Sequence, residues 1–153
     1  MGCTSSRDSV PFVEGAHAEE SFCFAAECGI KIHSVEFREF QAAVKRFGYR
    51  IDMTEEHMRA IAPEIHLDVD QMMNDSMSAY AVAYLDKEFS YKEGKHNVEN
   101  LTLIGWLLCK HWNDETQARE LWHIINPELL PFVTKRDVLS IVTRLAYIAV
   151  NLN

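Results

Sequence analysis

Residues 98–150 read VENLTLIGWLLCKHWNDETQARELWHIINPELLPFVTKRDVLSIVTRLAYIAV. Apolar side chains recur along them every three or four residues, which is the spacing of one face of an α-helix. Pro127 and Pro131 interrupt this pattern, because proline cannot donate to a helical hydrogen-bond ladder. The spacing therefore predicts three helices, separated by a polar break and by a connector that contains the prolines. Their apolar positions are Leu101, Ile104, Leu107 and Leu108, then Leu121, Ile124 and Ile125, then Val138, Ile141, Val142, Leu145 and Ile148.

Polar residues mark where the second and third of these helices start. Asn113 is a weak start signal, and Asp114 and Glu115 follow it where the positive end of a helix dipole favours acids. Thr134 is a suitable N-cap for the last helix, and Asp137 stands three residues later in the place of a capping-box acid. We expect the apolar face of the last helix to be buried against the region of Trp106 to Trp122.

Besides helices over about 18–28 and over 78–86, two helices are predicted in the first half of the chain. Phe37, Phe40, Val44 and Phe47 recur at helical spacing, and Gly48 is the expected stop. A second helix follows the N-cap Thr54 and should end or kink at a proline. The residues of this second helix that should face the core are Met58, Ile61 and Ile65, and the proline is Pro63.

The proline-containing connector resembles the calcium-binding loop of an EF-hand. Residues 126–137 place the apolar Val133 at the eighth position and the acidic Asp137 at the twelfth, with an amphipathic helix on each side. The helix ending in Leu-Leu-Cys, the polar link and the next helix resemble calcineurin-B-like and neuronal-calcium-sensor proteins. The resemblance implies an all-α fold of paired helix-loop-helix lobes with degenerate loops. A helical bundle with a proline-bounded connector is the alternative.

The resemblance divides the chain into a flexible leader and two lobes. The leader covers 1–17, the N-terminal lobe 18–85 and the C-terminal lobe 86–153. Three earlier segments fit the same twelve-residue pattern. The interval between the last two of these is short, so the sequence leaves open whether both are EF-hand remnants. The three segments are 25–36, 66–77 and 89–100.

Calcium needs a set of oxygen ligands that includes a bidentate acid at the twelfth position. Segment 66–77 holds the best ligand set, but it begins with His66 and ends with Met77. Segment 126–137 has Leu130 and Pro131 in place of an oxygen ligand and the flexible glycine. We therefore expect no metal to be bound, and no other cofactor. The weak vestigial candidates for metal ligands are Asp68, Asp70, Asn74, Glu36 and Asp137.

The chain has 153 residues, of which 48% are apolar, so it can bury a real core. Its formal net charge is -8, which disfavours nucleic acid as a partner and favours a basic or amphipathic helix. Aromatic anchors carry much of the energy of protein interfaces. The candidates for partner-binding residues are Trp106, Trp112 and Trp122.

The chain begins MGCTSS. Gly2 and Ser6 match the pattern for N-myristoylation, and Cys3 is placed for palmitoylation. One acyl chain binds a membrane only weakly, and basic residues are sparse here, so Cys3 would have to supply the second anchor. An unmodified tail is the alternative. A start of this kind joined to EF-hands resembles trypanosomatid flagellar calcium-binding proteins. The resemblance implies a location on the cytoplasmic face of a flagellar or ciliary membrane. Without acylation the expected location is the cytoplasm.

No apolar run is long enough to cross a bilayer, and residues 1–25 do not read as a signal peptide. Without an export signal the cysteines are expected to be reduced thiols. The spacing Cys23-x4-Cys28, near His17 and His33, could also be drawn as a zinc site, although it is not a usual structural spacing.

Enzyme motifs are absent from the sequence: we find no nucleophile elbow, no HExxH and no glycine-rich phosphate loop. The sequence therefore predicts a non-catalytic adaptor or regulatory subunit, tethered to a membrane, that binds a partner helix in an apolar groove without calcium. Two alternatives stay open. One is a soluble structural subunit of a large assembly, ciliary or organellar, and the other is a weak residual calcium sensor.

Overall fold

The computed structural model describes residues 31–46, 52–67, 69–70, 91–92 and 95–151. Within these residues the chain is mostly helical, as predicted, and it also has a small antiparallel sheet that the sequence did not predict. The predicted leader 1–17, the helices predicted over 18–28 and 78–86, and the border between the two predicted lobes lie outside the described residues. The elements are η2 (Lys31–Ser34), α2 (Phe37–Lys45), β1 (Asp52–Thr54), α3 (Glu55–Ile61), β2 (Tyr91–Lys92), β3 (Lys95–Asn97), α6 (Val98–Leu108), α7 (Asp114–Ile125) and α8 (Lys135–Asn151).

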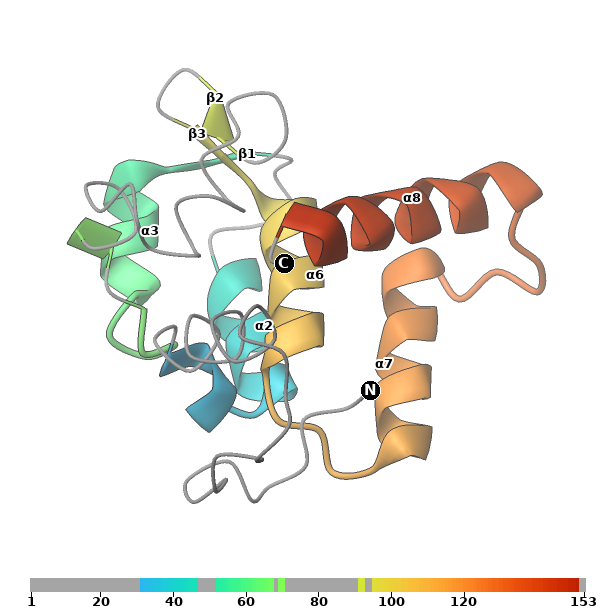
Figure 1. The fold of residues 1–153 in the computed structure, drawn as a ribbon, viewed down its shortest axis with the longest axis horizontal. Helices are drawn as coiled ribbons and strands as arrows, with labels where there is room; N and C mark the ends of the chain where they lie inside the picture. The colour runs from blue at the N-terminus through green and yellow to red at the C-terminus, as the bar shows by residue number, and fades with distance from the viewer. Residues whose placement is uncertain (1–30, 47–51, 68, 71–90, 93–94, 152–153) are drawn as a thin grey trace, which may run out of the picture.

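Helix α6 is the centre of the fold and contacts α2, α7 and α8 (Figure 1). Its N-cap is Asn97, whose side-chain oxygen accepts a hydrogen bond from the backbone N–H of Asn100 at 2.9 Å. Its apolar residues are not confined to one face, which is typical of a buried helix. Its largest buried side chains are Leu101, Leu103, Ile104 and Leu108.

Helix α2 packs directly on α6, and its buried residues confirm the predicted face. Phe37, Phe40 and Val44 are each at most 1% exposed, whereas Phe47 and the expected stop Gly48 lie outside the described residues. The chain just before α2 also bonds to the chain after α6. The backbone N–H of Phe37 donates to the carbonyl of Lys110 at 3.0 Å, and the N–H of Lys110 donates to the carbonyl of Val35 at 2.9 Å. These bonds hold the start of α2 next to the end of α6.

Helix α3 also follows its sequence signals. The hydroxyl of Thr54 accepts a hydrogen bond from the N–H of His57, which confirms Thr54 as the N-cap. The helix ends at Ile61, just before Pro63, as predicted. The three predicted core residues, Met58, Ile61 and Ile65, are fully buried.

The sheet has the strand order β1-β3-β2 and is antiparallel. Met53 in β1 lies opposite His96 in β3, and both side chains are buried. Strand β1 leads directly into α3, and β3 leads directly into α6. The pairing therefore holds the starts of α3 and α6 next to each other.

Helices α7 and α8 begin where the polar signals predict. The side chain of Asn113 accepts a hydrogen bond from the N–H of Thr116 at 2.8 Å and caps α7. Helix α8 lies across α6 and α7, with which it makes its contacts. Only Ile148 of the predicted apolar face is fully buried. Val138, Ile141 and Leu145 are partly buried and Val142 is 51% exposed, so the prediction that the whole face is buried is wrong.

One hydrophobic cluster joins both halves of the described chain. It combines side chains from 32–69 with side chains from 101–148, and Trp106, Ile141 and Leu145 pack against it while only partly buried. None of the helices in the described part of the chain is both long enough and apolar enough to span a membrane.

Candidate interaction surface

His111 fastens α7 to the body of the protein. Its Nδ1 lies 2.6 Å from Oε2 of Glu120 in α7, and its Nε2 lies 2.7 Å from the carbonyl oxygen of Trp106 in α6. The side chains of His111 and Glu120 are 8% and 11% exposed. Both ring nitrogens of His111 thus contact oxygen atoms, one in α7 and one in α6.

Two further bonds strengthen the same attachment. Nε of Arg38 in α2 donates to Oε1 of Glu120 at 3.2 Å. Nε1 of Trp106 donates to the carbonyl of Gln117 at 3.0 Å. Trp106, predicted as a partner-binding residue, is therefore half-buried and anchors α7 to α6. These bonds attach the first two turns of α7 to α2 and α6. The end of α7 and the link to α8 follow this attached part.

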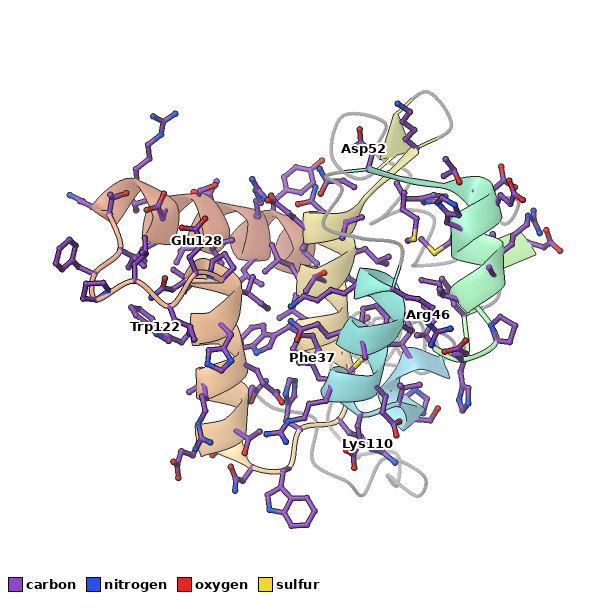
Figure 2. The ribbon with its side chains drawn as sticks, turned by 180° about the vertical axis from the view of Figure 1, so that it is seen from behind. Phe37, Arg46, Asp52, Lys110, Trp122 and Glu128 are labelled. Atoms are coloured by element: carbon purple, nitrogen blue, oxygen red, sulfur yellow. The ribbon has the colours of Figure 1, made fainter. Side chains whose placement is uncertain are left out.

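Exposed apolar side chains are concentrated in the residues that follow the attached turns of α7. Apart from Trp112, every large hydrophobic side chain that is exposed in the described residues lies between Trp122 and Val142. Phe132 is 79% exposed. Figure 2 shows Trp122 and Glu128 on the side of the molecule opposite Arg46 and Asp52. We call the following set the α7–α8 surface: Trp122 in α7, Leu129, Leu130 and Phe132 in the link between the helices, and Leu139 and Val142 in α8.

Asn126 gives the first part of the link a fixed shape. It is 2% exposed, and its side chain bonds both backbone groups of Leu130, donating to the carbonyl at 2.8 Å and accepting from the N–H at 2.9 Å. Leu129 is held between them at a φ of 53°, in the left-handed region that a leucine rarely adopts. Strain of this kind persists only where the surroundings impose it. The apolar side chains of the link are thus presented by an ordered turn.

Thr134 and Asp137 fix the second part of the link through the predicted capping box. The hydroxyl of Thr134 donates to Oδ2 of Asp137 at 2.7 Å, and the same oxygen accepts the backbone N–H of Thr134 at 3.0 Å. The N–H of Asp137 donates back to the Thr134 hydroxyl at 3.2 Å. These bonds hold the pKa of Asp137 below its ordinary value. The carboxylate is therefore already used to begin α8.

The described metal-ligand candidates are not brought together. Glu36 is exposed at the start of α2, and Asp70 forms an ion pair with Arg59 at 2.8 Å. Asp68 and Asn74 lie outside the described residues. Among those that the structure describes, no group of three or more His, Cys, Asp or Glu side chains could hold a metal ion. Absence of calcium binding stays a prediction.

The three tryptophans do not form one site. Trp112 is 86% exposed just before α7, and Trp122 is 42% exposed near the end of that helix. Helix α7 begins at Asp114, so eight helical residues lie between them, which corresponds to about 12 Å along the helix axis. Gly2 and Cys3, the predicted acylation sites, lie outside the described residues.

Sequence reasoning missed the contribution of the link and of Leu139. The available signal was that Leu129, Leu130 and Phe132 are apolar yet lie in a segment that its prolines keep out of a helix.

We compared the chain with models of protein families, with curated proteins and with solved structures, and none of them matches.

Proposed function

We propose that this chain is a non-catalytic adaptor or regulatory subunit that binds a helix of a protein partner on the α7–α8 surface. The observation that carries the proposal is a set of large apolar side chains left exposed on an ordered turn and the adjoining helices. Burying one such side chain contributes about 1.5–3 kcal/mol. Contiguous exposed apolar residues on an otherwise packed protein are typical of interaction sites.

The same proposal includes an EF-hand-like arrangement of the helices. It is supported by the bounds of α7 and α8, which flank the segment 126–137 as the entering and exiting helices of such a loop would. It is also supported by the pairing of Met53 with His96 in the sheet. Helix α3 begins two residues after Met53, and α6 begins two residues after His96. His96 is the eighth residue of segment 89–100. This reading differs from the sequence prediction, which placed loops before α2 and after α3, at 25–36 and 66–77, and none between these helices.

Binding to the partner should not need calcium. In segment 126–137 the carboxylate of Asp137 is engaged by Thr134, and Asn126 is engaged by Leu130. Both groups stabilise the link without an ion. The link therefore has the conformation proposed to bind the partner without an ion. We expect the affinity for the partner to be the same in calcium and in chelator.

Acyl groups on Gly2 and Cys3 would hold the chain at a membrane, and the partner would be a membrane protein or be recruited there. This part of the proposal rests on the sequence MGCTSS. It is independent of the α7–α8 surface, because the chain could bind the same partner as a soluble subunit.

The test compares three full-length proteins, expressed with their own N-terminus and used to capture partners from native membranes. They are the wild type, Phe132→Ser on the α7–α8 surface, and the control Ala118→Ser at an exposed position of α7. We expect one protein to be captured by the wild type and the control, with calcium or with chelator, and to be lost with Phe132→Ser. Its purified form should then bind directly. Equal capture by Phe132→Ser, or capture that requires calcium, would overturn the proposal.

A further inference from the structure

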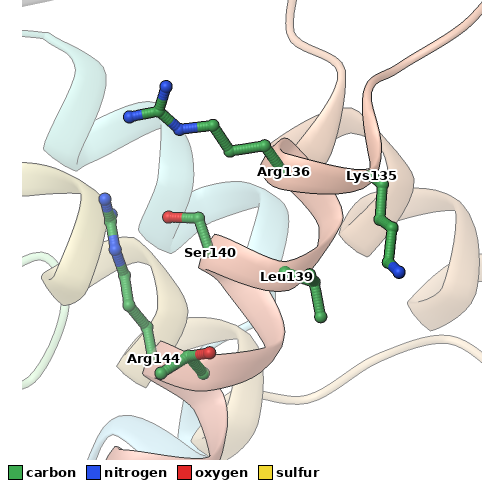
Figure 3. Close-up of a pocket in the computed structure, with 6 residues that line it drawn as sticks. Lys135, Arg136, Leu139, Ser140 and Arg144 are labelled. Carbon is green, nitrogen blue, oxygen red and sulfur yellow. The ribbon is translucent and has the colours of Figure 1, made fainter.

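Cationic side chains accompany the apolar ones along α8. Arg136, Ser140 and Arg144 are spaced four residues apart, so they share one face of the helix. Figure 3 shows these three side chains pointing to one side, with Lys135 and Leu139 on the other. Together with Thr143 they line a shallow depression on the outer face of α8. A surface that is locally basic thus lies on a chain whose formal net charge is -8.

The two cations at the start of α8 are balanced only in part, by the neighbouring Asp137, whose carboxylate is bonded to Thr134. Arg144 forms an ion pair with Glu99 of α6. In the part of the chain that the structure describes, neither Lys135 nor Arg136 forms an ion pair, and both are exposed. They also occupy the first turn of α8, where the helix dipole favours acids and disfavours bases. An anionic group bound here would relieve this unfavourable arrangement.

The depression is not purely ionic. Leu139, one turn after Lys135, is 51% exposed, and so is Val142. A group that covers this face must supply apolar side chains for the leucine and valine and anionic oxygens for the cations. Arginine in particular matches carboxylates, because its guanidinium can make two parallel hydrogen bonds to the two oxygens.

We infer that the partner segment is an acidic amphipathic helix, with its apolar face on Leu139 and Val142 and its carboxylates against Lys135 and Arg136. This inference rests on the proposed function and names the chemistry of its partner. It differs from the basic partner that the net charge predicts, because the described residues that line this depression include three bases and no acid. An anionic membrane is the less favoured occupant, because Glu128 is exposed in the same link as Phe132 and would enter the headgroup layer with it.

The experiment uses two designed helical peptides with the same leucine face, one carrying glutamates and the other lysines on its polar face. Each is titrated into the full-length protein by calorimetry at low and at physiological salt. We expect the glutamate peptide to bind at least tenfold more tightly than the lysine peptide, and its affinity to fall as salt rises. Arg136→Gln should weaken it by about three- to fivefold, as expected for an exposed ion pair. The matched control is Arg119→Gln, since Arg119 is an exposed arginine of α7 that pairs with Glu115, and its affinity should equal that of the wild type.

The outcomes separate this inference from the proposed function. If the lysine peptide binds as well as the glutamate peptide or better, and Phe132→Ser abolishes that binding, the acidic partner is wrong and the α7–α8 surface remains the docking site. If neither peptide binds and Phe132→Ser also leaves partner capture unchanged, both proposals fail. Binding to phosphatidylserine vesicles in preference to the glutamate peptide, lost in Arg136→Gln, would assign the face to lipid and overturn the inference. Self-association in sedimentation that excludes the peptide would assign it to a second copy and also overturn it.

Discussion

Gly105 lies directly against the ring of Phe40, so that a Cβ atom at residue 105 would come within 3.0 Å of the Cδ1, Cε1 and Cζ atoms of that ring. Phe40 is fully buried in α2, and Gly105 is inside α6. A glycine inside a helix costs about 1 kcal/mol relative to alanine. The chain accepts this cost because the missing side chain lets α2 and α6, the two helices at the centre of the core, approach each other.

Gly105→Ala should therefore destabilise the protein, although alanine is the better helix former. We expect the free energy of unfolding to fall by about 1–3 kcal/mol, the usual effect of overpacking a core. Urea unfolding followed by tryptophan fluorescence measures this. The control is the same change in a Phe40→Leu background, where the smaller side chain should reduce the cost of the alanine. An unchanged or raised stability in the Phe40 background would show that the two helices are not so close.

The fold could be predicted from the sequence where the signal is local. Thr54 and Asn113 cap their helices through bonds to residues three positions away, and Pro63 acts within one turn. The sheet could not be predicted, because β1 and β3 are short and come from distant parts of the chain. Nothing in the residues near Met53 indicates that His96 will lie opposite it.

The contribution of the link and of Leu139 to the α7–α8 surface could not be predicted for a related reason. Helical spacing identifies an apolar face but does not say whether anything covers it. In α8 the same periodic pattern includes Ile148, which α6 and its neighbours bury, and Val142, which remains half exposed. Burial depends on how far α8 extends past α6, which is a property of the tertiary structure.

Substitutions along α8 should show this difference directly. Ile148→Ala removes methyl groups from a fully buried position and should lower the free energy of unfolding by about 2–5 kcal/mol. Val142→Ala, at a position that is 51% exposed, should change it by less than about 1 kcal/mol. Both values come from urea unfolding of the full chain. An equal loss of unfolding free energy in the two variants would mean that α8 is rotated about its axis, so that another face of the helix contacts the core.

The acyl anchor is tested by fractionating cells that express the full chain. Gly2→Ala should abolish myristoylation and release the protein from membranes, because the second acylation usually follows a first membrane contact. Cys3→Ser should leave only weak, exchanging association, since one myristoyl chain binds with a constant of about 10⁴ M⁻¹. Partner binding by the purified variants should be unchanged. If the wild type stays soluble, or Gly2→Ala still sediments with membranes, the soluble-subunit alternative replaces the anchor.

The last prediction concerns pH and the buried imidazole of His96. This side chain lies in β3 and is fully buried, and burial lowers its pKa from 6.5 to about 4, although the charge of Glu55 acts in the opposite direction. In the unfolded chain the imidazole takes up a proton near pH 6.5, whereas in the folded protein it does so only near pH 4. Protons therefore favour the unfolded state between these two values. The contribution of His96 to stability is complete above pH 6.5 and is lost progressively as the pH falls toward 4.

This loss should amount to roughly 3 kcal/mol across the interval. Urea unfolding of the wild type and of His96→Gln at several pH values measures it, because glutamine does not titrate and the carboxylates act alike in both proteins. We expect the stability of the wild type to fall more steeply than that of His96→Gln between pH 6.5 and 4. The variant should be less stable at pH 8, since glutamine fills the site opposite Met53 less well. Parallel slopes for the two proteins would show that His96 is protonated in the folded state as readily as in the unfolded chain, and that its site at the start of α6 admits water.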